Sequence, residues 1–333
     1  MDVLTDLLTR SRARGAAFAR ARARGDWGIA FPAVPGPTLH TVLEGQVALW
    51  TGNPGDALAL RPGDVVLVRQ QTEQHLGHTP GASCVPIEEL AAGSPDRQIM
   101  LERPGSPASA AFFCGAYLFE GDLSGGLLSS LPTTLRLQPA AGSSLRATTD
   151  LIARELLQDE PGQQTLLDRL LDVALVQILR EHFTTNQHTA PAWFRASSHP
   201  HLGPALRAVH ANPGHPWTVA ELAAHASLSR AAFARRFNHE LGVAPLTYLT
   251  DWRMALARER LRDSNDGIAA IAQSLGYASE FSFAAAFKRH EGIAPGRWRN
   301  HARATGQGHH GATSQASSEL ARARSNPRSS ARP

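Results

Sequence analysis

The sequence predicts an α+β protein: a β-rich N-terminal domain followed by helices, and an all-α C-terminal domain that holds two helix-turn-helix units. Three observations predict this fold class. Short apolar runs between Gly and Pro turns occupy the first part of the chain. A helical period of Leu, Ile and Val begins near residue 145. A helix–turn–helix pattern then occurs twice, 50 residues apart, which indicates two copies of one supersecondary unit.

The β-rich region extends from residue 26 to about residue 140. Its apolar runs are WGIAFP, LHTVLEGQVALW, ALALRPGDVVLVRQ and FFCGAYLFE. Several short strands at this spacing predict a small barrel or a jelly roll. The run before them, RSRARGAAFARARARG, is basic and rich in Ala. We expect that run to form an exposed, solvated N-terminal helix.

Residues 145–183 follow the helical period instead. Leu, Ile and Val recur at i, i+3, i+4 and i+7 in two stretches that Pro161–Gly162 separates, LRATTDLIARELLQ and QTLLDRLLDVALVQILREHF. This leucine-rich stripe suits either a dimer seam or packing against the β-rich domain. Residues 184–200 are rich in Thr, Ser, Pro and His and predict a linker. Residues 301–333 have no apolar period and predict a disordered basic tail.

The repeated pattern is clearest in LGYASEFSFAAAFKR, which begins at Leu275. Gly276 can adopt positive φ in a sharp turn, and Ser279 is a natural helix N-cap. The earlier stretch LAAHASLSRAAFARRFNHELGVAPLTY has the same pattern, with a turn that is one residue shorter. We expect both Phe pairs to pack in the core. The residues that correspond at an offset of 50 are Ser229 and Ser279, Phe233 and Phe283, Phe237 and Phe287, Gly242 and Gly292, Pro245 and Pro295, and Tyr248 and Trp298.

Composition limits the classes of function. The 333 residues suffice for two domains, and no apolar run is long enough for a membrane span or forms a signal peptide. Two cysteines, Cys84 and Cys114, lie in unrelated contexts, which favours a reducing cytoplasm over a disulfide scaffold or a zinc finger. The net charge is −4 for residues 1–199 and +4 for residues 200–300, which suggests a polyanionic partner for the helical domain.

Two stretches resemble the double helix-turn-helix domain of AraC/XylS-type transcription regulators. They are WTVAELAAHASLSRAAFARRFNHELGVAPLTYLTDWRMALARERL and IAAIAQSLGYASEFSFAAAFKRHEGIAPGRWR, about 100 residues with their connection. Four N-terminal stretches resemble the cupin-type sensory domain often fused to it: LHTVLEGQVAL, LRPGDVVLV, CGAYLFE and LLSSLP. The resemblance implies a cupin-like β-barrel as an effector domain over 1–144, a helical dimerisation or packing segment over 145–183, and a DNA-binding domain over 201–300.

The resemblance implies that the second helix of each unit enters a major groove of double-stranded DNA. These helices are expected at about 229–238 and 279–288. Arg235 is the expected guanine reader, and Ala231 or Ala234 could contact a thymine methyl group. Ala285 stands where many relatives carry Arg or another polar residue, so we expect the second unit to bind mainly through phosphates. The candidate base-contacting residues are Arg230, Ala231, Ala234, Arg235, Glu280, Ser282 and Ala285.

Basic side chains near these helices are the candidate phosphate contacts, although any one of them could be a solvated surface charge. They are Arg236, Lys288, Arg289, Arg297 and Arg299. The basic run before residue 26 could also contact DNA, but we favour the interpretation that it forms an exposed, solvated helix.

The cupin-like region offers an incomplete set of metal ligands. Cupin enzymes hold a metal with three His and a carboxylate, whereas the matching positions here offer His40, Glu44 and a His75 displaced by about one residue. A site with two or three ligands is conceivable, but a structural or effector-binding role for these residues is favoured. We expect no metal and no cofactor. The sequence contains no G-x-S-x-G motif, P-loop or dinucleotide fingerprint, so an enzyme is not expected.

The sequence therefore predicts a cytoplasmic, sequence-specific DNA-binding transcription regulator. Its expected partners are an operator, a small-molecule effector, a second copy in a homodimer, and RNA polymerase if it is an activator. The alternative is a metal-dependent cupin enzyme fused to a DNA-binding module.

Overall fold

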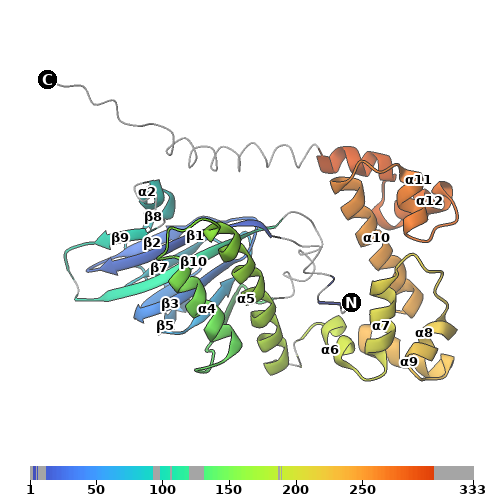
Figure 1. Ribbon diagram of the computed structural model, residues 1–333, viewed down its shortest axis with the longest axis horizontal. Coiled ribbons are helices and arrows are strands. Elements are labelled where there is room, and N and C mark those ends of the chain that lie inside the picture. Colours follow the sequence, from blue (N-terminus) through green and yellow to red (C-terminus); the bar gives the residue numbers. More distant parts are fainter. Residues whose placement is uncertain are drawn as a thin grey trace. The chain divides into compact units, whose positions relative to one another are not determined.

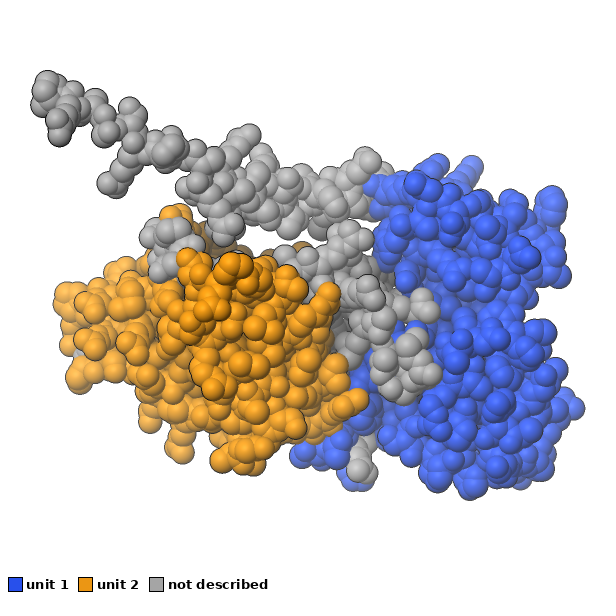
Figure 2. All heavy atoms as spheres, viewed as in Figure 1, with its two compact units in different colours: residues 1–11, 121–125, 183–319 blue, residues 12–120, 126–182, 320–333 orange. Residues whose placement is uncertain are grey.

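A computed structural model describes residues 3, 4, 6, 13–92, 98–105, 107–119, 131–186, 188 and 190–303. The chain divides into two compact units (Figure 2). The sheet unit comprises the described residues from 13 to 182, and the helical unit comprises residues 3, 4, 6 and the described residues from 183 to 303. The expected disordered tail lies outside the described residues from 304 onward, as does most of LLSSLP. No helix within the described ranges is long and apolar enough to cross a membrane.

Two sheets form the sheet unit (Figure 1). The first sheet has the order β11 (Thr134–Leu137), β6 (Val65–Val68), β3 (Thr38–Gly45), β10 (Ser109–Phe119), β1 (Ala13–Arg24) and β9 (Gln98–Glu102). The second has the order β5 (Leu58–Leu60), β4 (Val47–Trp50), β7 (Gln74–Gly77), β2 (Gly28–Phe31) and β8 (Val85–Pro86). A 3-10 turn, η1 (Pro54–Asp56), and a short helix, α2 (Ile87–Ala92), lie between strands. The predicted β-rich N-terminal domain is confirmed.

The core of the sheet unit lies between the two sheets. Trp27 and Phe112 stack at its centre, with ring centroids 5.6 Å apart. Aliphatic side chains from both sheets pack around them, among them Ile29, Val66 and Leu76. Burying apolar side chains of this size stabilises the fold by about 1.5–3 kcal/mol each.

Strand β1 corrects the expected N-terminal helix. The strand pairs with β10 in antiparallel fashion and with β9 in parallel, so it lies inside the first sheet. Ala21 and Ala23 are buried in the core, whereas Arg22 and Arg24 are exposed. The alternation of Ala and Arg places one residue type on each face of a strand, and this period outweighs the helix propensity of Ala.

Two helices, α4 (Ser144–Glu155) and α5 (Gln163–Thr185), follow the strands, as predicted (Figure 1). Ser143 caps α4 by accepting a hydrogen bond from the backbone N–H of Arg146. The hydroxyl of Tyr117, a buried residue of β10, donates to the carbonyl of Leu171 on α5 at 2.9 Å. Helix α5 therefore packs on the face of the first sheet that points away from the second sheet.

The helical unit consists of short helices around a long one (Figure 1). They are α6 (Ala192–Ser198), α7 (Leu202–Ala211), α8 (Val219–His225), α9 (Arg230–Leu241), the long α10 (Pro245–Asp263), α11 (Ile268–Ser274) and α12 (Glu280–Glu291), and residues 295–303 are also helical. Helices α8 and α9 form the first helix-turn-helix, and α11 and α12 form the second. Phe233, Phe237, Phe283 and Phe287 are all buried in one core cluster, as predicted.

The ends of these helices carry the expected caps. Ser229 accepts a hydrogen bond from the N–H of Ala232, and Ser279 forms a capping box with Ser282. Gly242 and Gly292 end the two second helices with φ of 74° and 80°, a left-handed conformation that favours Gly. The turn before α12 is one residue longer than the turn before α9, as the sequence predicts.

The segment expected as a linker is partly helical. Helix α6 forms within it and packs against α7 and α9. Ala196 is buried in the core of the helical unit, and Trp193 packs beside it. The rings of Phe183 and Phe194 lie 4.8 Å apart. Apolar residues at helical spacing therefore define α6 inside a stretch whose overall composition is that of a linker.

The first residues of the chain belong to the helical unit rather than to the sheets. Val3 lies in the core cluster of the helical unit. The carboxylate of Asp6 accepts a hydrogen bond from Nδ1 of His210 on α7 at 2.9 Å, and both side chains are buried. Nε2 of His210 lies 2.8 Å from the hydroxyl of Tyr248 on α10. Burial and the nearby Asp6 carboxylate raise the pKa of Tyr248, so its hydroxyl stays protonated in this chain of hydrogen bonds.

Candidate nucleic-acid interface

Helix α9 turns one row of side chains away from the core. Consecutive residues of an α-helix are about 100° apart, so residues at i, i+4 and i+7 share a face. Because Phe233 and Phe237 are buried, the opposite face carries Ala231, Arg235 and Asn238, and all three are exposed. We call these three residues the outward row of α9.

Helix α12 has an equivalent row 50 residues later. Its buried face carries Phe283, Ala286 and Phe287. The opposite face carries Phe281, Ala285 and Lys288, and all three are exposed. We call these residues the outward row of α12.

The predicted base contacts fall partly on these rows. Ala231, Arg235 and Ala285 lie on them, whereas Ala234 is half-buried beside the α9 row. Arg230 and Glu280 are the first residues of the two helices and lie to one side of the rows. Asn238 and Phe281 are absent from the predicted base contacts, although both fall on the outward rows when 100° per residue is counted from the Phe pairs.

Ser282 is engaged in the cap of α12. Its hydroxyl donates to the carbonyl of Ser279 at 2.8 Å and accepts from the N–H of Ser279 at 3.2 Å. This use leaves the hydroxyl without a proton to offer to a base. The geometry of α12 therefore favours Phe281 over Ser282 as the residue that meets a ligand.

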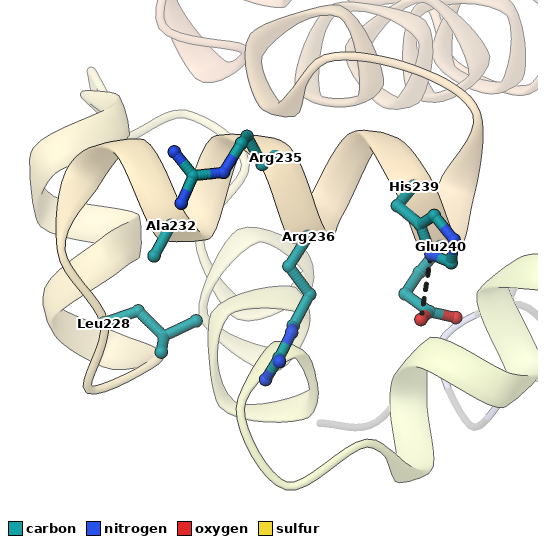
Figure 3. A pocket seen from close by; sticks show the side chains of 6 residues that line it. All are labelled: Leu228, Ala232, Arg235, Arg236, His239 and Glu240. Atoms are coloured by element: carbon teal, nitrogen blue, oxygen red, sulfur yellow. Dashed lines mark hydrogen bonds and ion pairs between the residues drawn. The ribbon is translucent and has the colours of Figure 1, made fainter.

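A groove of about 400 Å³ runs along one side of α9 (Figure 3). Arg235 and Arg236 line it together with His239, whose Nδ1 lies 3.3 Å from Glu240 Oε1. Leu228, from the turn before α9, and Ala232 complete its wall. Two guanidinium groups and the Glu240 carboxylate thus lie along this groove, which leaves it with a net positive charge.

The candidate phosphate contacts differ in how they are held. Arg236, Lys288, Arg289 and Arg297 are exposed. Arg299 is only half-exposed, and its Nη2 donates to the carbonyl of Asp266 at 2.6 Å. Part of the Arg299 guanidinium is therefore committed to the loop that precedes α11.

Arg253 of α10 ties the two helix-turn-helix units together. Its guanidinium donates to the carbonyls of Pro213 and His215, at 2.7 and 2.8 Å, in the loop between α7 and α8. The same group lies over the ring of Tyr277, in the turn between α11 and α12, 5.7 Å from its centroid. One side chain thus contacts the loop that leads into the first unit and the turn of the second.

Gly276 allows this close approach. Its φ is +78°, and an added Cβ would lie 2.1 Å from the carbonyl oxygen of Gly214. A side chain here would push the turn of the second unit away from the loop of the first. The expected positive φ at Gly276 is confirmed, and its further role is to bring the two units into contact.

The three predicted effector residues of the sheet unit do not converge. His40 points into the core between the sheets, where Nε2 donates to Gln74 Oε1 at 2.7 Å and Nδ1 accepts from the Cys114 thiol at 2.9 Å. Burial lowers the pKa of His40 to about 4, so the ring is neutral. Burial also raises the pKa of Cys114, which keeps the thiol protonated as a donor.

Glu44 lies on the opposite face of the first sheet. A bulge between Val42 and Glu44 shifts the register of β3 against β10, so Glu44 stands opposite Ala111 instead of following the face of His40. Glu44 is exposed and lies 3.6 Å from Arg22.

His75 also points away from the core. Its ring stacks on Trp50 at 5.4 Å, and its Nε2 lies 3.6 Å from Glu73. The neighbouring residue on β7, Gln74, faces inward and contacts His40, because a shift of one residue reverses the face of a strand. Within the described residues, no group of three or more His, Cys, Asp or Glu side chains could hold a metal ion.

Comparisons with known proteins agree with this architecture. A family model described as "Cupin" matches residues 2–184, and one described as "Helix-turn-helix domain" matches residues 222–301. An AraC-like transcription regulator of Streptomyces lividans is 31% identical over 304 residues, which cover 90% of this chain and 99% of that protein. The chain belongs to the AraC-like transcription regulators.

Other relatives of this AraC-like regulator cover it to a similar extent. The regulator AlkR of Acinetobacter baylyi is 28% identical, with 90% of this chain and 99% of AlkR covered. The RCS-specific transcriptional activator RclR of Escherichia coli is 29% identical, with 91% of this chain and 99% of RclR covered.

Among solved structures, a crystal structure of the AdpA DNA-binding domain with a target DNA matches part of the chain. It is 30% identical over 32% of this chain and 96% of that one, with a TM-score of 0.31.

The predicted family, fold class and general function are thus confirmed. This AraC-like regulator is a DNA-binding transcription regulator with a cupin-like sensing domain. Its relatives are named as regulators of transcription rather than as enzymes.

Proposed function

We propose that this regulator binds one face of an operator with α9 and α12 in successive major grooves, about 34 Å apart along the DNA. The observation that carries this proposal is the pair of outward rows, which the contacts of Arg253 and Gly276 hold in one orientation. A connection of this kind makes the spacing of the two half-sites part of what the protein recognises.

In the first unit, Arg235 reads a base by pairing its guanidinium with the O6 and N7 atoms of guanine. Ala231 lies one turn before it, close enough to meet a thymine methyl group, and Asn238 lies one turn after it. An Asn side chain can pair with adenine through two hydrogen bonds. Arg230 and Ala234 flank this row and contact the adjacent nucleotides.

Phosphate contacts come from the exposed basic side chains. Arg236 lies in the groove beside α9, and Lys288, Arg289 and Arg297 surround the C-terminal end of α12 and the helix after it. These contacts hold the protein on the duplex without selecting a sequence. Arg299 and Glu280 lie at the border of this surface and contribute least.

The sheet unit senses a small molecule, and α4 and α5 join two copies of the chain. Four apolar side chains on or beside these helices are exposed, Leu151, Leu157, Leu166 and Val173, with 37–49% of their surface accessible. Apolar surface of this kind supports self-association.

Because DNA is its target, the regulator acts in the cytoplasm, and as an activator it contacts RNA polymerase.

Selection from genomic fragments with purified full-length protein tests this function. Footprinting of the selected site at several salt concentrations should show two protected patches about one helical turn apart. Salt-sensitive binding without a preferred sequence would contradict the proposal and leave only a general affinity for DNA.

A further inference from the structure

Phe281 is the most exposed large apolar side chain among the described residues, at 89%. It is the second residue of α12. The other two aromatic residues of this helix, Phe283 and Phe287, are fully buried. Phe281 therefore contributes no packing to the helical unit, and its ring stands in solvent.

The position of Phe281 indicates what this ring meets. Phe281 begins the outward row of α12, with Ala285 one turn later and Lys288 one turn after that. The row thus presents two apolar side chains followed by a positive charge. This combination suits a negatively charged partner that also exposes apolar groups. The major groove of DNA is such a surface, because its only apolar group is the C5-methyl of thymine and phosphates line its edges.

The neighbours of Phe281 point to the same ligand. Ser282 has its hydroxyl bound in the helix cap, and Ala285 has only a methyl group, so neither competes by donating a hydrogen bond to a base. The small Ala285 also leaves space for a base edge to approach the ring. Phe281 and Ala285 therefore favour contact with thymine, which exposes a methyl group, over contact with bases that are recognised through hydrogen bonds.

We propose that Phe281, supported by Ala285, specifies thymine in the half-site of the second unit by packing its ring on thymine C5-methyl groups. This proposal rests on the proposed function, since it requires α12 to enter a major groove. The second unit then selects sequence as well as binding phosphates.

Removing single methyl groups from the operator tests this role. Each thymine of the second half-site is replaced in turn by deoxyuracil, and the Kd of full-length protein is measured for the wild type and for Phe281→Ala. Loss of one buried methyl should weaken wild-type binding about fourfold at one or two positions. Phe281→Ala should bind the unmodified operator less tightly and show no further loss at those positions.

Three controls keep the result specific. Arg235→Ala should keep the wild-type deoxyuracil profile in the second half-site, because Arg235 lies in the other unit. Phe281→Leu should keep part of the methyl dependence. At a sensitive position, replacement of the T·A pair by C·G should weaken wild-type binding, and 5-methylcytosine should restore part of the affinity in the wild type alone.

The outcomes separate this proposal from the function on which it rests. A wild-type protein that binds a discrete operator but ignores every deoxyuracil overturns the role of Phe281 and leaves the regulator intact. So does an equal deoxyuracil loss in the wild type and in Phe281→Ala. Failure of the wild type to prefer any sequence overturns both.

Discussion

The two helix-turn-helix units share a scaffold and differ in what they present. Both have a Ser cap, a buried Phe pair and a left-handed Gly at the end of the second helix. Their outward rows differ at every matching position: Ala231, Arg235 and Asn238 face outward from α9, and Phe281, Ala285 and Lys288 from α12. The repeated residues build the fold, and the proposed DNA contacts rest on the residues that differ. On that proposal, polar recognition is concentrated in the first unit and apolar recognition in the second.

The largest expected effect is a loss of stability from a substitution in the buried core of the second unit. Phe283→Ala should destabilise the helical unit by about 3–5 kcal/mol, because it leaves a cavity where a fully buried ring was. Phe281→Ala, the same substitution two residues away, should change stability by less than about 0.5 kcal/mol. Calorimetric unfolding of the full-length protein compares the two. Similar losses in both variants would contradict the division between scaffold and outward row.

The next largest effect is expected from removing Arg253, whose contacts connect the two helix-turn-helix units. Arg253→Ala removes two charge-assisted hydrogen bonds and should cost about 1.5–3 kcal/mol of stability. It should also let the protein accept operators with one or two base pairs inserted between the half-sites, measured as the ratio of Kd values for the altered and the natural spacing. Arg253→Lys keeps the charge but not the two-pronged geometry and should behave like Arg253→Ala. A spacing preference that survives in Arg253→Ala would assign the coupling to other contacts.

A smaller change isolates the reader of the first unit. Arg235→Ala should relax specificity at one base pair and cost about 1–3 kcal/mol of binding free energy there. Arg235→Lys should lose the same discrimination, because an ammonium group does not match two acceptors of guanine at once. Binding to a set of single-base operator variants measures both. Uniform weakening on all sequences would instead make Arg235 a phosphate contact.

The smallest change concerns the last position of each row. Lys288→Ala should weaken binding to all sequences alike and flatten the slope of log K against log salt by about one unit. Asn238→Ala, at the matching position of α9, should leave the slope unchanged because Asn carries no charge. Titrations at four or more salt concentrations determine the slopes. An unchanged slope in Lys288→Ala would remove this residue from the phosphate contacts.

Much of the helical unit could be predicted because its information is local and occurs twice. Caps, turn lengths and buried rings follow from Ser279, Gly276 and the Phe pairs. Phe281 was missed for a physical reason: an apolar residue is usually assigned to a core, and its place opposite Phe283 is clear only when the helix is projected down its axis.

The sheet unit was harder to predict because the placement of its candidate residues depends on long-range register. One bulge after Val42 sends Glu44 to the far face of the first sheet, and one residue of displacement turns His75 outward in favour of Gln74. The displacement of His75 is visible in the sequence, but the bulge and the face on which His75 lies depend on strand pairing. Strand β1 was misread because Ala favours helices in isolation, while its pairing partner β10 lies about 90 residues further along the chain.

The buried pair of Asp6 and His210 sets an order of events during synthesis. The two residues are 204 positions apart, so at about 5–20 residues per second the ribosome makes His210 roughly 10–40 s after Asp6. In that interval the ribosome makes residues 13–182 of the sheet unit, while His210, the partner of Asp6, has not yet been made. The core of the DNA-binding unit thus includes residues that are made before the sheet unit. A regulator built in this way completes its DNA-binding core only after the chain of its sensing domain has been made.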